Sequence, residues 1–149
     1  MGNTGPGAVA REAWGHVVQL FTSEENQRSF LEAAGSLELT PGGLRALLGL
    51  VPDEMTSMGI LAQQWHCDPS NVTAVVDQLE QRGFVERRVS ALDRRVKTVG
   101  LTRGGAVARQ QAIERLSVPP AGFDALSGPE QLALRDLLRK VTADLPPLR

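Results

Sequence analysis

Apolar residues recur along this chain at helical spacing, in segments separated by glycine, proline and hydroxyl residues. The first helical pattern begins at Val9, after residues 1–8, which contain three glycines and one proline and are predicted to be a disordered tail. The pattern leaves open whether one helix continues to about Gly35 or a break divides it near Ser23. A break is favoured by Thr22 and Glu25, whose spacing fits a second capping box.

Capping residues mark the start of the next three predicted helices. The first begins after Thr40 and the third after Asp68, each cap being followed by proline, and the second is expected from Ser57 to Trp65. Proline is well tolerated there because its missing N–H would have no partner at the first helical position. Gly83 ends the third helix, since glycine readily adopts the left-handed conformation that terminates helices. The last two of these helices, joined by a short turn, form a predicted helix–turn–helix.

Two short valine-rich stretches follow, at 84–89 and 96–101, and their partial alternation predicts a β-hairpin with a long tip. A further helix is expected over 102–116, and residues 117–126 are predicted to be a loop. A last helix begins at the capping box of Ser127 and Glu130. The chain is therefore predicted to be mainly helical, with one small β element.

Charge is distributed unevenly along the chain. The 149 residues have a net charge of −1, yet the segment from Arg87 to Arg103 contains six basic residues and one acidic residue, a local charge of +5. A near-neutral total argues against a histone-like protein that coats DNA. Positive charge on one hairpin beside one helix is instead typical of a protein that docks on duplex DNA.

Composition excludes several other classes of protein. Cys67 is the single cysteine, so an internal disulfide is excluded, and no apolar run approaches the roughly 20 residues that span a bilayer. With no apolar signal core either, we expect a cytoplasmic protein without membrane contact. His66 adjoins Cys67 while His16 is distant, so no metal site is predicted. We also expect no cofactor and no enzymatic activity, because no catalytic group can be assembled from these residues.

Three motifs together resemble the MarR family (multiple antibiotic resistance regulators). Residues 71–80 resemble the family's recognition helix, residues 82–87 resemble its exit into the first wing strand, and residues 93–102 match its Asp-x-Arg…Leu-Thr wing motif. The resemblance implies a winged helix–turn–helix with flanking dimerisation helices. It implies one domain over 9–145: an N-terminal dimerisation region (9–39), a winged-helix DNA-binding core (40–102) and C-terminal dimerisation helices (103–145).

The family resemblance also implies a function. It predicts a homodimer that binds a pseudo-palindromic operator in double-stranded DNA and regulates transcription, as a repressor released by a small aromatic or anionic effector. Two alternatives remain: a regulator of the same fold that is ligand-independent or responds to oxidation of Cys67, and a winged-helix module for protein interaction.

A helix can enter the major groove when its outward face is short and polar. Asn71 can pair with adenine, and Ala74 is small enough to lie against a thymine methyl group. The hydroxyl groups on this face can donate to bases or phosphates. The predicted reading positions are Pro69, Ser70, Asn71, Thr73 and Ala74.

The hairpin provides a second predicted contact. Arg94 and Arg95 are candidates for the minor groove, whose negative potential attracts arginine. The family resemblance implies in addition that Arg95 pairs with Asp77 and fixes the wing against the helix, which leaves Arg94 as the freer contact. The other basic side chains, predicted to lie near phosphates, are Arg87, Arg88 and Lys97.

The last helix carries an apolar seam that exceeds what a lone surface helix needs. Because one recognition helix reads only a few base pairs, a two-fold partner is needed for specificity, and we expect the seam to form the dimer interface. The alternative is packing on the chain's own core. Trp14 and His16 are candidates for a ligand pocket, although Trp14 also fits a core position. The seam consists of Leu134, Leu137, Leu138, Val141 and Leu145.

Overall fold

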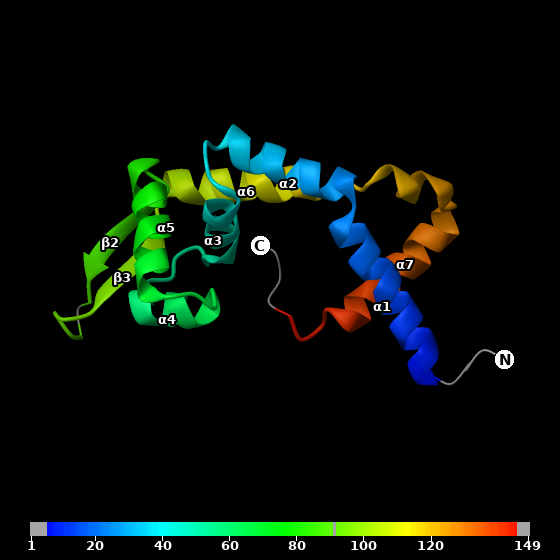
Figure 1. Ribbon diagram of the computed structural model, residues 1–149, viewed down its shortest axis with the longest axis horizontal. Coiled ribbons are helices and arrows are strands. Elements are labelled where there is room, and N and C mark those ends of the chain that lie inside the picture. Colours follow the sequence, from blue (N-terminus) through cyan, green and yellow to red (C-terminus); the bar gives the residue numbers. More distant parts are fainter. Residues whose placement is uncertain (1–5, 91, 146–149) are drawn as a thin grey trace.

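The computed structural model describes residues 6–90 and 92–145, which form α-helices, one short 3-10 helix (η1) and a small antiparallel sheet (Figure 1). The predicted fold class, mainly helical with a small β wing, is confirmed. In chain order the elements are α1 (Pro6–Thr22), α2 (Glu24–Ser36), α3 (Pro41–Gly49), β1 (Thr56–Ser57), α4 (Met58–Gln64), α5 (Pro69–Gln81), β2 (Val85–Val89), β3 (Lys97–Leu101), α6 (Arg103–Leu116), η1 (Ala121–Ala125) and α7 (Gly128–Val141).

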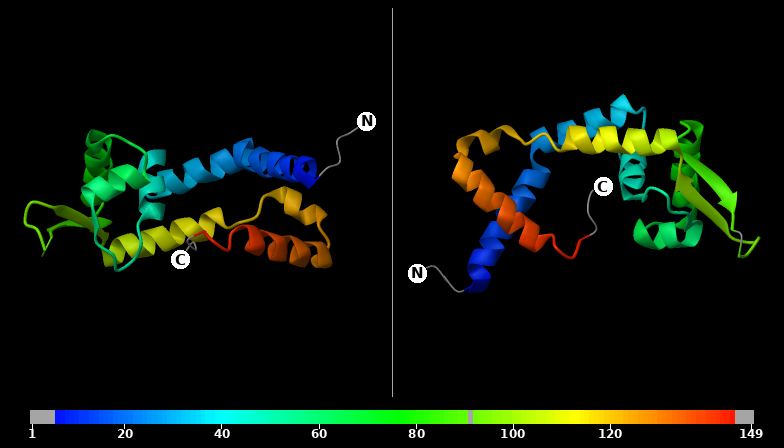
Figure 2. Two further views of the ribbon diagram at one scale, coloured as in Figure 1. Left: turned by 90° about the horizontal axis from the view of Figure 1, so that it is seen from below. Right: turned by 180° about the vertical axis from the view of Figure 1, so that it is seen from behind.

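The molecule is elongated, with different elements at its two ends. Helices α3, α4 and α5 and the sheet form one end, and α1 and α7 form the other (Figures 1 and 2). Helices α2 and α6 pack against each other and connect the two ends. The β2–β3 hairpin therefore projects at the opposite end of the molecule from α1 and α7.

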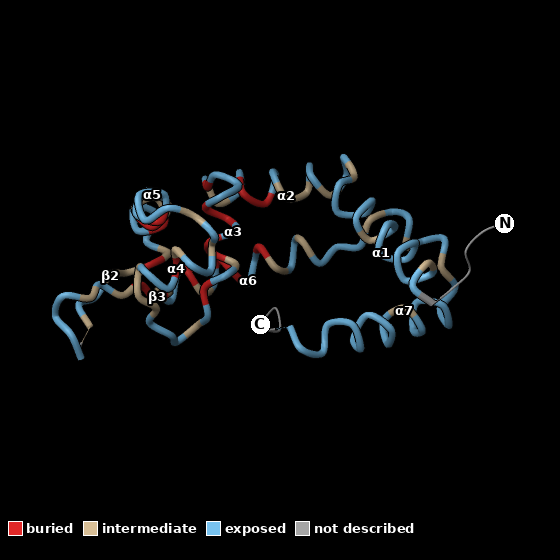
Figure 3. Tube along the Cα trace, turned by 60° about the horizontal axis from the view of Figure 1, so that its bottom comes forward, coloured by how far each residue is buried: buried red, intermediate tan, exposed pale blue. Residues whose placement is uncertain are grey.

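Burial is concentrated at the end that contains the sheet. One core cluster joins α3, α4 and α5 to the sheet, and a second joins α2, α3 and α6. Figure 3 shows buried residues there and exposed residues along most of α1 and α7. The winged-helix end thus has its own hydrophobic core, whereas the other end leaves its apolar side chains in solvent. The side chains with no exposed surface are Leu44, Leu47, Leu61, Val72, Val76, Leu79 and Val99.

The sheet has one strand more than the sequence predicts. The predicted hairpin is confirmed to within one residue at each end, with Val85 opposite Leu101 and Val89 opposite Lys97. Strand β1 adds to the free edge of β3 and pairs Thr56 with Val99, giving the order β1-β3-β2. Sequence patterning could not reveal β1, because two residues are too few to show an alternation.

The first helical segment is divided at Ser23. Its hydroxyl accepts a hydrogen bond from Asn26 N, 3.3 Å away, and caps α2. The predicted capping box of Thr22 and Glu25 is therefore wrong by one residue. Thr22 instead bonds back to its own helix, and Glu25 Oε1 accepts from Ala121 N at 3.1 Å.

Two predicted irregular segments are partly helical. The expected tail over 1–8 is wrong for residues 6–8, which form the start of α1, while residues 1–5 lie outside the described part of the chain. The predicted loop over 117–126 contains η1. The capping box of Ser127 and Glu130 is confirmed, and the Ser127 hydroxyl and backbone N–H donate to the Glu130 carboxylate and lower its pKa.

A buried arginine ties α6 to α3. Arg109 is 6% exposed, and its Nε donates to the carbonyl of Leu48, 3.2 Å away, in the last turn of α3. Among the described residues no carboxylate pairs with it, but the carbonyls at a helix C-terminus carry partial negative charge. Desolvation lowers the pKa of Arg109, although a guanidinium stays charged at neutral pH.

The start of α6 lies against the backbone that leads into β2. Thr102 N donates to the carbonyl of Phe84 at 3.0 Å, and the Thr102 hydroxyl caps the helix by accepting from Gly105 N at 2.9 Å. A Cβ at Gly105 would lie only 1.8 Å from the Phe84 carbonyl oxygen. Glycine is therefore required here by the close approach of two backbone segments.

We expect Gly105→Ala to lower the free energy of unfolding by about 1–3 kcal/mol, because the Phe84 backbone cannot yield without loss of its bond to Thr102. Urea unfolding followed by circular dichroism measures this. Gly104→Ala is the matched control in the same helical turn. Its Cβ would have no neighbour closer than 3.6 Å, so it should be neutral or stabilise by up to about 1 kcal/mol. Equal losses in the two variants would contradict the argument.

Candidate nucleic-acid interface

Helix α5 presents a polar face to solvent at its N-terminal half. Asp68 is the N-cap and Pro69 the first helical residue, as predicted. Val72 is fully buried, which turns the intervening side chains outward. The Thr73 hydroxyl donates to the Pro69 carbonyl at 3.0 Å, so its acceptor lone pairs remain available. All five predicted reading positions are exposed: Pro69, Ser70, Asn71, Thr73 and Ala74.

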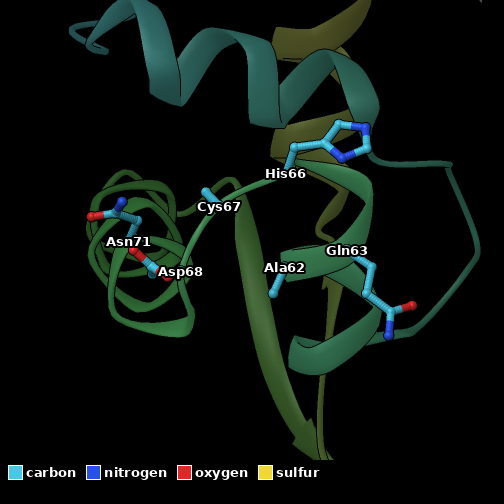
Figure 4. A pocket seen from close by; sticks show the side chains of 6 residues that line it. All are labelled: Ala62, Gln63, His66, Cys67, Asp68 and Asn71. Atoms are coloured by element: carbon cyan, nitrogen blue, oxygen red, sulfur yellow. The ribbon is translucent and has the colours of Figure 1, made fainter.

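The turn between α4 and α5 borders an open hollow of about 490 Å³ (Figure 4). His66 adopts a positive φ of 49°, and Cys67 N donates to the Ala62 carbonyl at 3.2 Å, so the chain reverses tightly here. Asn71 lines the hollow and links it to the reading face. The hollow is lined by Ala62, Gln63, His66, Cys67, Asp68 and Asn71. The helix–turn–helix is thus concave between its two helices.

The wing is fixed to α5 by an ion-pair cluster centred on Arg87. Its guanidinium pairs with Asp77 and with Glu80, both on α5, and also lies 3.4 Å from the Thr73 carbonyl oxygen. The predicted pairing of Asp77 with Arg95 is therefore wrong. Arg87 stands in the middle of β2, which packs against α5, whereas Arg95 lies in the loop beyond the strands. Glu80 was missed, although its position one helical turn after Asp77 places both carboxylates on one face.

The other end of α5 is held by a second set of polar contacts. Gln78 Oε1 accepts from the Thr40 hydroxyl at 2.9 Å and from Thr40 N at 3.4 Å. Arg82, the C-cap of α5, forms an ion pair with Glu38 in the linker between α2 and α3. Sequence reasoning did not identify these contacts, which join residues far apart in the chain. Helix α5 is therefore held by its C-terminal half, and its N-terminal half exposes polar side chains to solvent.

The described residues of the wing tip make local hydrogen bonds and include basic side chains that pair with no described carboxylate. Asp93 Oδ1 accepts from Arg95 N at 2.9 Å, and Ser90 N donates to the Val96 carbonyl at 2.9 Å. Among the described residues, no carboxylate pairs with the side chains of Arg94, Arg95 or Lys97.

The remaining predicted phosphate contacts are engaged within the chain. Arg88 is exposed and pairs with Glu86 on the same strand, and Arg87 is held by its two carboxylates on α5. The uncompensated positive charge of the wing therefore lies at its tip.

The comparisons with known proteins agree with this geometry. Residues 39–97 match the model of the MarR family. The chain is also 26% identical over 93 residues to the organic hydroperoxide resistance transcriptional regulator of Bacillus subtilis (strain 168). The match covers 62% of this chain and spans 63% of that regulator's length. The chain is therefore similar to the MarR family over its winged-helix segment.

Solved structures of similar proteins extend the likeness beyond the matched segment. Apo wild-type MarR from E. coli is 25% identical with a TM-score of 0.69, over 89% of this chain and 96% of that one. YusO from Bacillus subtilis is 23% identical with a TM-score of 0.68, over 96% and 100%. The S. aureus MepR–DNA complex is 19% identical with a TM-score of 0.59, over 88% and 99%. The MarR-like arrangement therefore includes α1, α2, α6 and α7 as well as the winged helix.

The residues considered for other chemistry lie apart from this face. Trp14 and His16 are exposed on α1 and do not line the hollow, so their role in ligand binding stays a prediction. The described residues contain no group of three or more potential ligands that could hold a metal ion. None of the described helices combines the length and apolar character needed to cross a bilayer.

A double-mutant cycle tests whether Arg87 fixes the wing to α5. We expect Arg87→Met and Asp77→Asn to show a coupling of about 0.5–1 kcal/mol in the free energy of unfolding, because the partly buried pair is lost in either variant. A matched cycle of Arg95→Met with Asp77→Asn should give no coupling within about 0.3 kcal/mol. If Asp77 couples to Arg95 and not to Arg87, the pair of Asp77 with Arg95 that the family resemblance implies would be correct after all.

Proposed function

We propose that this protein is a sequence-specific transcriptional regulator that binds duplex DNA as a homodimer. The observation that carries the proposal is the position of two free surfaces at one end of the molecule. These are the exposed polar start of α5 and the unpaired cations of the wing tip (Figure 1). Such a pairing suits one helix in the major groove and one hairpin in the adjoining minor groove.

The contacts divide into those that read bases and those that position the protein. Asn71 has a free side chain on the exposed face of α5 and can donate to and accept from adenine. Arg94 and Arg95 are both available for the minor groove, because Asp77 is occupied by Arg87. The brace holds the wing at a set angle to α5, so that both elements can meet the duplex at once. The structural likeness to MepR, which was solved as a DNA complex, supports this arrangement.

Arg94→Ala should weaken DNA binding and reduce the slope of log K against log salt by about one unit, because one phosphate-neutralising charge is removed. Duplexes selected from a random library by the wild-type protein provide the probe, and fluorescence anisotropy between 50 and 200 mM salt gives the slope. Arg28→Ala, which removes an exposed charge on α2, is the control and should leave the slope unchanged. If the wild-type protein selects no sequence, the proposed function fails.

The dimer is inferred from the apolar side chains that α1 and α7 leave in solvent. None of the described residues of α7 is buried, although it carries an apolar seam. Several large apolar side chains exposed on the same helices are typical of an interaction site. The large exposed residues are Val9, Trp14, Val18, Leu20 and Phe21 on α1, and Leu132, Leu137, Leu138, Val141 and Leu145 on α7 and the turn after it.

A second copy of the chain is the occupant that this surface fits. A dimer through α1 and α7 keeps both wings at the outer ends of the assembly, as a pseudo-palindromic operator requires. Exposure of Trp14 on this surface also removes the alternative that it is a core residue.

We expect Val141→Glu to convert the dimer to a monomer at micromolar concentration, because a carboxylate would be buried without a partner in the interface. Val141 is 74% exposed in the single chain, so the monomer itself should fold normally. Val89→Glu changes an exposed valine on the wing, 58% exposed, and should remain dimeric. Sedimentation velocity distinguishes the two, and a wild-type monomer would contradict the inferred dimer.

Repressor action and release by a small aromatic or anionic effector stay predictions from the family resemblance. DNA binding measured with and without small aromatic acids tests release by ligand. Oxidation of Cys67 in the same assay tests the redox alternative. A protein-interaction module would show no selected DNA sequence in any of these conditions.

A further inference from the structure

A leucine at the tip of the wing has its side chain entirely in solvent. Leu92 is 100% exposed, between Ser90 and the basic pair Arg94 and Arg95. Single exposed apolar residues are common on protein surfaces. This one differs because it lies in the loop between β2 and β3, beside the basic pair Arg94 and Arg95.

Hydrogen bonds hold the backbone at Leu92 and in the residues that follow it. Ser90 Oγ accepts from Leu92 N at 3.2 Å and from Asp93 N at 3.4 Å. The Asp93 carbonyl accepts from Val96 N at 2.9 Å, and its carboxylate accepts from Arg95 N. These bonds fix the chain after Leu92 and anchor its own N–H. The side chain of Leu92 itself is fully exposed to solvent.

The inferred dimer does not cover this residue. Most other large exposed apolar side chains lie on α1 and α7, whereas the hairpin projects at the opposite end of the molecule (Figures 1 and 2). A partner that approaches the wing tip must also accommodate the positive charge of Arg94 and Arg95. Duplex DNA meets both conditions, because the minor groove combines a negative potential with apolar sugar walls and stacked base edges.

We propose that Leu92 is a minor-groove contact that enters between the sugar walls ahead of the two arginines and favours deformable base steps. The inference rests on the proposed DNA-binding function and deepens it. The arginines supply charge that is independent of sequence, while the leucine gains only where the groove can widen or a step can partly unstack. Pyrimidine–purine steps such as TA deform most easily, so they are the expected preference beneath the wing.

An ionic contact makes DNA affinity depend on salt, whereas an apolar contact does not. The salt slope therefore distinguishes the contribution of Leu92 from those of Arg94 and Arg95. We expect Leu92→Ala to weaken binding to the library-selected duplex about 5- to 20-fold, with a salt slope equal to that of the wild type. Leu92→Met keeps the apolar volume and should bind within about twofold of the wild type. Replacing a TA step beneath the wing by GC should weaken DNA binding by the wild-type protein. The same replacement should leave DNA binding by the Leu92→Ala variant nearly unchanged.

Val89→Ala is the matched control, because it shortens another exposed apolar side chain on the same hairpin, at the end of β2 and not in the loop itself. It should bind as the wild type does. Three results would overturn the inference: unchanged affinity in Leu92→Ala, a loss accompanied by a smaller salt slope, or an equal loss in Val89→Ala. If one of these results is found while the wild-type protein binds DNA and Arg94→Ala reduces the salt slope, only the proposed Leu92 contact is rejected and the proposed DNA binding stands. If no duplex is selected at all, the proposed function falls with it.

Discussion

Burial of one stripe of α5 is the constraint on which the arrangement of this protein depends. Val72, Val76 and Leu79 have no exposed surface and lie in the core shared by α3, α4 and the sheet. Once these side chains are fixed, helical geometry turns Ser70, Asn71 and their neighbours toward solvent. The polar face of the recognition helix is thus a consequence of core packing, and rotation of α5 would expose the stripe.

Polar contacts then set the position of the wing and of the helix ends. Arg87 reaches from β2 to two carboxylates on α5, and Gln78 bonds to the cap of α3. Both sets of contacts join the C-terminal part of α5 to its surroundings. The opposite half makes few such contacts, so the same helix is anchored at one end and available for binding at the other.

The two ends of the molecule differ in how their apolar surface is used. The winged-helix end has its own buried apolar core, while most of α1 and α7 is exposed. Helices α2 and α6 connect the ends, and the buried Arg109 ties α6 to α3. Packed helices, not a flexible linker between separate domains, therefore connect the proposed dimer surface to the proposed DNA-binding surface.

Local patterns in the sequence were sufficient for most helices, for the hairpin and for the outward face of α5, because caps, periodicity and turn residues act over a few positions. They could not show that Arg87 rather than Arg95 pairs with Asp77, since several arginines were available and only the packing of β2 on α5 selects one. Strand β1 and the bond from Thr40 to Gln78 likewise depend on segments distant in sequence. The sequence by itself determined the helices, the hairpin and the polar face of α5, because these depend on residues a few positions apart. Tertiary structure decided which charges are neutralised within the chain and which, at the wing tip, remain free.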